Sequence, residues 1–507
     1  MGRVKSATKN IAFGYLSNMI TMLGSFVLRT IFISRLGETL NGVNDLYTGI
    51  LSILSMAELG VGTAFNYSLY GPVARGDFEK IKSYMKVYRK AYMIIGMIIA
   101  VIGVGISPFL QYIISNPGSI ALNDLRCYYF IFLFNTVSTY FVSYKYSLVN
   151  AEQKNYIQTN VITITKIITI SLQILAVLIT GNFYVYLFTA AIVELLQKIF
   201  VSSYLNKRYP YLKDQDVKAL SREESREIVA KTKALVFHKV GDVARLQTDS
   251  IIIAAFIDVG LVGKVGNYNM VITSVSNFVN IIFNSVLSSF GNLIATEDKE
   301  KQYSMFQVYR FAACWIYGFS AIGFYMLLTP LVGNLWLGEN WILAPGIVGC
   351  ILIDYYFKGD RVVLSNFKTA AGVFEQDKYL ALIQGAVNLV ISIVLVQRMG
   401  LIGVYIGTIV SGLIANITKP CIIYKVCFQK KVAVYFRDSL KYCGVLVLVL
   451  VLCLAAKQVM MPAVTFVTFV GMMIAVTVIF NGCFLLLFGR SKEFHYLWGL
   501  VKNRITR

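Results

Sequence analysis

The chain has 507 residues, of which 57% are hydrophobic and only 14% are charged, and its mean hydropathy is +0.65. A soluble domain carries about 25% charged residues, so this composition excludes a soluble globular protein and predicts a polytopic membrane protein. The net charge of +21 does not indicate a nucleic-acid partner, because the Lys and Arg residues gather in alternate loops, as the positive-inside rule describes.

Long apolar runs recur along the chain, and they are continuous rather than alternating, which predicts helices and not the strands of a β-barrel. We expect an all-α protein with fourteen transmembrane helices. A basic loop is expected at 75–90 and a turn at Asn116-Pro117-Gly118. The fourteen helices are expected at 11–34, 40–69, 91–114, 125–149, 157–179, 183–205, a seventh ending at 258, 262–294, 311–331, 341–366, 379–396, 401–426, 442–456 and 462–488.

An even number of helices places both termini on one side of the membrane, and that side collects nearly all the Lys and Arg between the helices, so both termini are expected in the cytoplasm. The longest polar stretch divides the chain. We therefore expect an N-terminal lobe at 1–206, a basic cytoplasmic linker at 207–233, a C-terminal lobe at 234–426, and two further helices with a cytoplasmic tail at 427–507.

The two predicted lobes repeat each other. ARGDFEKIKSYMKVYR at 74–89 matches ATEDKEKQYSMFQVYR at 295–310, and two further matches follow in the same order: Glu152-Gln153…Tyr156 with Glu375-Gln376…Tyr379, and Gly181…Val185-Tyr186 with Gly400…Val404-Tyr405. Three matches at nearly one offset predict two parallel copies of a six-helix unit, an arrangement that places the substrate between the halves. Convergent loop chemistry is the alternative explanation.

The predicted seventh helix carries several polar and charged side chains: His238, Lys239, Asp242, Arg245 and Asp249. All except Lys239 recur at helical spacing and share one face. Because a charge at the centre of a membrane helix costs about 2.5–3.5 kcal/mol on insertion scales, such residues face a bundle interior or a wet cavity. We interpret this face as one wall of a polar chamber, and a ladder of ion pairs between helices is the alternative.

The repeat aligns Asn18, Ser25 and Arg29 of the first helix with the polar face of the seventh. Arg29 has no acid within one helical turn, so its partner is an anionic ligand or an acid from elsewhere, with Glu58 and Asp249 as the candidates. Lys166 of the fifth helix is a second cavity cation, or else a side chain that snorkels to the interface.

Other charged residues within the predicted helices are less specific. Candidate supporting groups for the cavity are Asn18, Ser25, Glu58 and Asp354. Glu194 with Lys198 is expected to form an ordinary intrahelical ion pair. The eight Cys are scattered without a CxxC pair and there are only two His, so we expect no metal site and no cofactor.

Several segments resemble a known family. RTIFISRLG, LSILSMAELGVGTA and YSLYGPVARGDFEKI are similar to the opening helices of Wzx-type polysaccharide flippases, and TDSIIIAAFIDVGLVGKVGNY resembles their seventh and eighth helices. These proteins belong to the MOP superfamily, with the MATE transporters and the lipid II flippase MurJ. The helix number, the repeat and the two extra C-terminal helices extend the resemblance to nearly the whole chain.

The resemblance implies a flippase that moves an undecaprenyl-pyrophosphate-linked oligosaccharide from the cytoplasmic to the outer leaflet of a bacterial cytoplasmic membrane, for capsule, exopolysaccharide or O-antigen assembly. It implies alternating access around a cationic cavity, without catalysis, and a polymerase and glycosyltransferases of the same pathway as partners beside the membrane lipids. By position, Arg29 and Arg245 fit the cavity cations. A coupling Na⁺ or H⁺ stays open, with Asp242 and Asp249 as its candidate carriers.

Three alternatives stay open beside the flippase. A MATE-like multidrug or cation antiporter is the first, although such a protein uses acids in its first half, where this chain offers Arg29 and Lys166. A membrane glycosyltransferase is the second, since Asp214-Gln215-Asp216 is a formal DxD motif, but its loop is far too short for a nucleotide-sugar domain. A channel is the third, and no selectivity-filter motif supports it.

Overall fold

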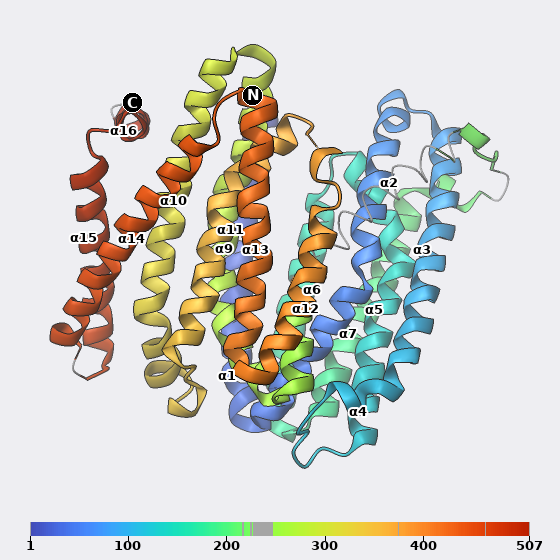
Figure 1. The fold of residues 1–507 in the computed structure, drawn as a ribbon. Coiled ribbons are helices and arrows are strands. Elements are labelled where there is room, and N and C mark those ends of the chain that lie inside the picture. Colours follow the sequence, from blue (N-terminus) through green and yellow to red (C-terminus); the bar gives the residue numbers. More distant parts are fainter. Residues whose placement is uncertain are drawn as a thin grey trace. The chain divides into compact units, whose positions relative to one another are not determined.

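The computed structural model describes the backbone of residues 2–505, apart from 215–216, 224–225, 227–246, 374 and 462. It also leaves out the side chains of 2–16, 56–61, 63–64, 67, 213, 284–288, 500–501 and 503–505. His238, Lys239, Asp242 and Arg245 therefore lie outside the described residues, as does the side chain of Glu58. The described chain is helical almost throughout (Figure 1). It divides into two compact units, Met1–Gly263 and Lys264–Arg507, and the four predicted domain ranges stay a prediction.

Unit 1 contains α1 to α7 and a helical segment at 247–256. The bounds are α1 Gly2–Leu54, α2 Met56–Arg75, α3 Phe78–Ile106, α4 Leu110–Ile113, α5 Leu122–Ala151, α6 Tyr156–Thr180 and α7 Phe183–Arg208. The first predicted helix and the start of the second both lie within α1 and are separated by Gly37. The φ of 85° at Gly37 suits glycine, because glycine has no Cβ. The second predicted helix is interrupted at Ser55, where α2 begins anew.

The expected basic loop at 75–90 is wrong, because α3 already begins at Phe78 and includes most of the cations assigned to that loop. The carboxylate of Asp77 accepts a hydrogen bond of 3.0 Å from the backbone N–H of Lys80. Such a cap satisfies an N–H group that the first helical turn leaves free, so the helix starts directly after Asp77 and continues through the basic residues into the apolar run.

Unit 2 contains most of α9 (Val259–Thr296) and all later helices. The bounds are α10 Lys299–Pro330, α11 Pro345–Ala370, α12 Leu380–Met399, α13 Leu401–Ile423, α14 Ala433–Met460, α15 Phe466–Phe488 and α16 Lys492–Ile505. Short π-helical turns extend α10 and α13, at Leu331–Trp336 and Tyr424–Phe428. The helix α16 lies in the segment that was expected only as a tail. Its apolar residues are too few for a membrane span and recur at amphipathic spacing.

Among the described residues, nine helices are long and apolar enough to cross a membrane. The protein is therefore a multi-pass membrane protein with an all-helical fold. The expected total of fourteen transmembrane helices stays a prediction, since segments such as α1 hold two predicted helices and the seventh is described only from residue 247.

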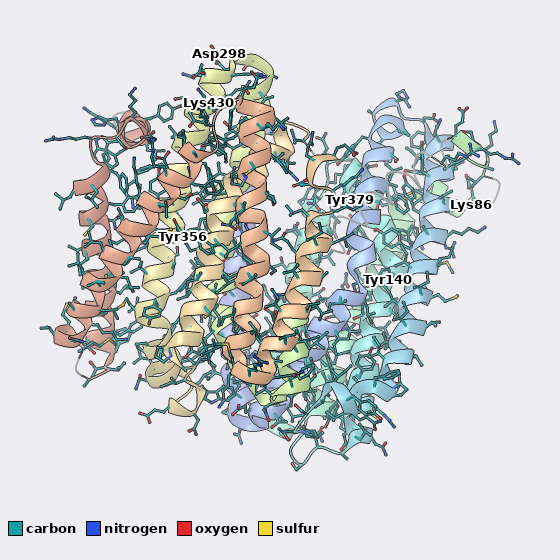
Figure 2. The ribbon with its side chains drawn as sticks, viewed as in Figure 1. Lys86, Tyr140, Asp298, Tyr356, Tyr379 and Lys430 are labelled. Carbon is teal, nitrogen blue, oxygen red and sulfur yellow. The ribbon has the colours of Figure 1, made fainter. Side chains whose placement is uncertain are left out.

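The same connectivity recurs in the two units, which supports the sequence repeat. In unit 1 α3 packs on α5, α5 on α7 and α6 on α7; in unit 2 α10 packs on α11, α11 on α13 and α12 on α13. Matched caps accompany the matched helices. Asp298 accepts from the N–H of Lys301 at the start of α10 (Figure 2), as Asp77 does at the start of α3. Gly181 and Gly400 both adopt a positive φ, 57° and 59°, between paired helices.

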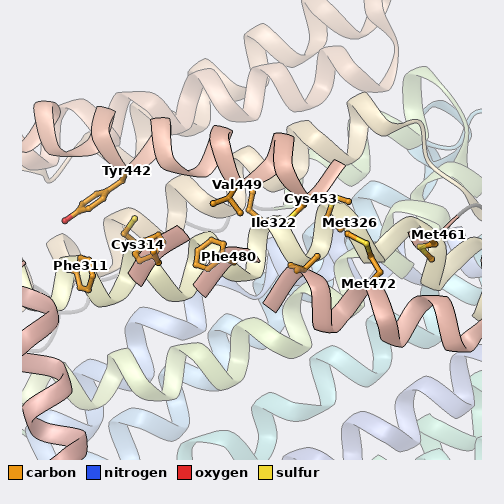
Figure 3. Packing of buried hydrophobic residues seen from close by; sticks show 12 residues of the cluster. Phe311, Cys314, Ile322, Met326, Tyr442, Val449, Cys453, Met461, Met472 and Phe480 are labelled. Carbon is orange, nitrogen blue, oxygen red and sulfur yellow. The ribbon is translucent and has the colours of Figure 1, made fainter. Parts of the chain in front are cut away.

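The C-terminal helices α14 and α15 pack on α10 through a buried apolar cluster that includes Phe311, Met326, Val449 and Phe480 (Figure 3). Phe494 of α16 joins this cluster beside Trp315, with their ring centroids 6.0 Å apart. This cluster joins the last three helices to α10 of unit 2.

A buried arginine fixes α14 to α10 and α11. The Arg310 guanidinium lies 3.5 Å from the ring centroid of Tyr435 and donates a 3.0 Å hydrogen bond to the carbonyl oxygen of the same residue. The Tyr435 hydroxyl donates to Asp360 at 2.6 Å, and Asp360 lies 3.7 Å from Arg310. The charge of Arg310 is thus compensated by a carboxylate, a ring face and backbone oxygen, all within unit 2.

Close backbone contact between α12 and α13 gives a test of the packing. A Cβ at Gly403 would lie 2.4 Å from the backbone oxygen of Leu395, which cannot move without shifting α12. Gly403→Ala should therefore destabilise the protein by about 1–3 kcal/mol, the usual cost of overpacking, and lower its melting temperature in detergent.

Gly444→Ala in α14 is the matched control, since a Cβ there meets nothing within 4 Å, and it should leave the melting temperature unchanged or slightly raised. Equal melting temperatures for the two variants would contradict the described contact between α12 and α13.

Candidate functional site

Unit 1 has an open cavity of about 660 Å³ between α1, α5, α6 and α7. Ligand pockets in proteins commonly measure about 300–1,000 Å³, so the cavity is large enough for a small molecule or part of a larger one. Its walls follow from helical spacing. The lining residues of α6 are Ile162, Thr165, Lys166, Thr169, Ile170 and Gln173, which recur every three or four residues and thus share one face.

Hydrogen-bonding side chains form much of the lining, and most of them are neutral. They are Ser25, Asn44 and Thr48 of α1, Asn135 and Thr139 of α5, Thr165, Thr169 and Gln173 of α6, and Tyr186 and Gln197 of α7. The ionisable acids and bases among the described lining residues are Lys166, Glu194 and Lys198. Such a lining suits a polar ligand with many hydrogen-bonding groups.

Arg29, which the sequence placed in the cavity, forms a bidentate ion pair with Asp45, with an Nη1–Oδ1 distance of 2.8 Å. Sixteen residues of continuous helix would separate the two by about 24 Å, so the turn of the chain at Gly37 brings them together. Asp45 is thus a partner of Arg29 that the sequence reasoning did not name, and contacts of Arg29 with Glu58 or Asp249 stay a prediction. Asn44, which lines the cavity, lies beside the pair and donates a long hydrogen bond of 3.5 Å to Asp45.

Lys198 is buried and is held mainly by α5. Its ammonium donates to the carbonyl oxygen and the side-chain oxygen of Asn135, both at 2.9 Å, and to the Ser138 hydroxyl at 2.8 Å. The expected ion pair with Glu194 is present, with an Nζ–Oε2 distance of 3.7 Å. Lys198 therefore neutralises Glu194 and also joins α7 to α5.

Lys166 lies on the cavity wall, is exposed there, and makes no hydrogen bond or ion pair within the part of the chain that the structure describes. Ser25 also lines the cavity, and its hydroxyl donates to the carbonyl oxygen of Thr21 at 2.7 Å. Of the sequence candidates, the structure thus brings Ser25 and Lys166 together in one cavity and puts Arg29 beside it.

The other candidates lie elsewhere or outside the described residues. Asn18 is exposed and does not belong to the lining. Asp249 is half-buried in the segment 247–256 of unit 1. Asp354 lies in unit 2, where it pairs with Lys358 one helical turn away. His238, Lys239, Asp242, Arg245 and the side chain of Glu58 are not described, so their assignment to a cavity stays a prediction.

Sequence reasoning missed the neutral part of the site. Asn135, Gln173 and Gln197 line the cavity, yet single amides on apolar helices do not stand out beside charged residues. The signal was the spacing of Thr165, Thr169 and Gln173, which places three polar groups on one face of an otherwise apolar helix.

Comparison with known proteins gives one family match and several structural matches. The model of a family described as polysaccharide biosynthesis protein matches residues 7–288. No curated protein sequence matches the chain.

The lipid II flippase MurJ in an inward closed conformation is similar over 94% of this chain and 100% of its own, with a TM-score of 0.69 and 13% identity. An inward-facing multidrug resistance MATE family transporter of the MOP superfamily is similar over 79% of this chain and 92% of its own, with a TM-score of 0.61 and 15% identity. The Vibrio cholerae MATE transporter VcmN is similar over 85% of this chain and 99% of its own, with a TM-score of 0.57 and 13% identity. At these identities the matches establish a shared fold.

The ion pair beside the cavity can be tested by exchanging its charges. Asp45→Asn removes the carboxylate that compensates Arg29, and breaking a largely buried pair costs about 3–5 kcal/mol, so the variant should melt well below the wild type. The double exchange Arg29→Asp with Asp45→Arg should recover part of that loss.

Glu375→Gln serves as the control, because it breaks the exposed pair with Lys378 and should cost less than about 1 kcal/mol. If Asp45→Asn melts no lower than this control, the pair does not hold the turn of α1 in place.

Proposed function

The chain belongs to the family of polysaccharide biosynthesis proteins, and we propose that it is a flippase for lipid-linked oligosaccharides. The substrate is an undecaprenyl-pyrophosphate-linked repeat unit, which moves from the cytoplasmic to the outer leaflet of a bacterial cytoplasmic membrane by alternating access. Both termini lie in the cytoplasm, and a polymerase and glycosyltransferases of the same pathway act beside it. The shared fold with the lipid II flippase MurJ supports this class of substrate.

The observation that carries the proposal is the cavity of unit 1, in which Lys166 shares the lining with many neutral hydrogen-bonding groups and with the ion pair of Glu194 and Lys198. An ammonium is a strong donor to phosphate oxygens, and an uncompensated cation among membrane helices is costly. A ligand phosphate removes that cost. Amide and hydroxyl side chains in turn exchange hydrogen bonds with sugar hydroxyl groups, while the polyprenyl chain stays in the lipid.

The movement needs no covalent chemistry in the protein. An inside-negative membrane potential favours outward movement of an anion by about 2.3 kcal/mol per charge and 100 mV if the charge crosses the whole field. Coupling to Na⁺ or H⁺ is proposed for Asp242 or Asp249, of which the structure describes Asp249, half-buried in unit 1.

A MATE-like antiporter for cations is the second candidate, since transporters of that kind share the fold. A cation site requires a carboxylate whose charge is not already compensated. Among the described lining residues the acid is Glu194, and Lys198 compensates it at 3.7 Å. The charges of the cavity therefore favour an anionic ligand over a cationic one.

Lys166→Gln tests the proposal, because it keeps a hydrogen-bonding side chain but removes the charge. A hydrogen bond to a charged group contributes about 1.5–3 kcal/mol, so transport should fall roughly tenfold or more. The measurement is the amount of surface polysaccharide per cell in a strain whose own flippase is deleted, at equal amounts of membrane protein.

Lys86→Gln is the control, since Lys86 lies on α3 outside the cavity lining (Figure 2) and its loss should not change export. Normal export by Lys166→Gln, or resistance to cationic dyes conferred by the wild type, would contradict the flippase assignment.

A further inference from the structure

The charge of Glu194 is compensated by Lys198, but its carboxylate oxygens accept no hydrogen bond from that residue, which leaves them able to bind a ligand. An ammonium group has three N–H donors. Those of Lys198 are directed to the two oxygens of Asn135 and to the Ser138 hydroxyl, at 2.8–2.9 Å. Glu194, at 3.7 Å, is beyond hydrogen-bond distance. Its charge is therefore balanced by Lys198, while its carboxylate oxygens accept no hydrogen bond from Lys198.

The Glu194 carboxylate faces the cavity rather than the protein interior. Its side chain is 37% exposed, whereas that of Lys198 is only 8% exposed, and both belong to the cavity lining. An ionised carboxylate has about four acceptor sites and no donor. Within the described part of unit 1 it makes no hydrogen bond, so its acceptor sites are available to a ligand in the cavity.

Two neighbouring amides present acceptors as well. The Gln197 amide nitrogen donates to the Tyr146 hydroxyl at 3.3 Å, and the Gln173 amide nitrogen donates to the carbonyl oxygen of Tyr186 at 3.2 Å. Each bond uses one of the two N–H groups of its amide, so the amide oxygen with its two acceptor sites and one N–H are left for a ligand. Glu194, Gln197 and Gln173 thus give this part of the lining an excess of hydrogen-bond acceptors.

We propose that Glu194 is the residue that recognises the sugar part of the substrate, by accepting hydrogen bonds from its hydroxyl or amide N–H groups, while Lys166 binds the pyrophosphate. This inference rests on the proposed flippase function and assigns the two ends of the head group to different residues. A carboxylate repels phosphate but accepts strongly from neutral donors. The ammonium of Lys198 lies near enough to balance the charge of Glu194 and leaves its oxygens accessible to a ligand.

Binding of two lipids to the purified full-length protein in nanodiscs separates the two roles. The probes are undecaprenyl diphosphate and undecaprenyl diphosphate that carries a single N-acetylglucosamine. The wild type should bind the sugar-bearing lipid more tightly. Glu194→Gln should weaken that binding about tenfold, the effect of losing a charged hydrogen bond, and leave binding of the bare diphosphate unchanged or stronger. Lys166→Gln should weaken the binding of both lipids by the same factor.

Two further variants exclude an effect on folding alone. Glu194→Gln with Lys198→Gln removes both charges together, so no uncompensated ammonium remains, and it should show the same selective loss of the sugar-bearing lipid. Glu339→Gln, in an exposed turn of unit 2, should bind both lipids like the wild type.

If Glu194→Gln weakens the binding of both lipids equally, or of neither, the assignment of Glu194 is overturned while the flippase function stands. A wild type that binds neither lipid would refute the flippase function itself and this inference with it. A shift in the pH dependence of transport, with binding of the sugar-bearing lipid unchanged, would make Glu194 a proton carrier instead and would also overturn the proposal.

Discussion

A charge inside a bilayer has to be compensated, and this constraint explains the arrangement of most ionisable groups in the described helices. Arg29 pairs with Asp45, Lys368 with Asp377 and Arg310 with Asp360 and Tyr435. The buried ammonium of Lys145 donates to Ser202 and Asn206 of α7. Each of these contacts also joins two helices or two parts of one. Lys166 differs from these residues, because it is exposed on a cavity wall and makes no hydrogen bond or ion pair with the described residues. In the proposed function a ligand phosphate compensates its charge.

The repeated helices of the two units differ in how they use their polar residues. In unit 2, α12 and α13 pack at backbone distance through Gly403 and Gly407, and the amide of Asn388 donates to Thr408 in the interior of the contact. At the positions that the repeat aligns with these glycines, α7 carries Tyr184 and Phe188. In unit 1, the polar faces of α6 and α7 line a cavity instead. One connectivity thus supports a closely packed pair in unit 2 and a ligand-sized space in unit 1.

The sequence predicted the features that arise from local rules. Apolar runs located the helices, the repeat aligned Asp77 with Asp298 before their capping roles were visible, and the spacing of Glu194 and Lys198 gave their ion pair. It did not predict the contact between Arg29 and Asp45, because sixteen residues and the turn at Gly37 separate them. Nor did it predict the neutral amides of the cavity, whose role depends on which faces of four helices meet. A neutral polar side chain costs less free energy in a membrane helix than a charged one, so it stands out less in an apolar sequence.

The central claim is that the cavity of unit 1 holds the phosphate-bearing head of a glycolipid. An experimental structure of the full chain bound to an undecaprenyl-diphosphate oligosaccharide tests it most directly. The account predicts diphosphate density within hydrogen-bonding distance of the Lys166 ammonium, with sugar density among the residues of α5, α6 and α7. A head group bound elsewhere, with Lys166 facing hydrocarbon or solvent, would contradict it.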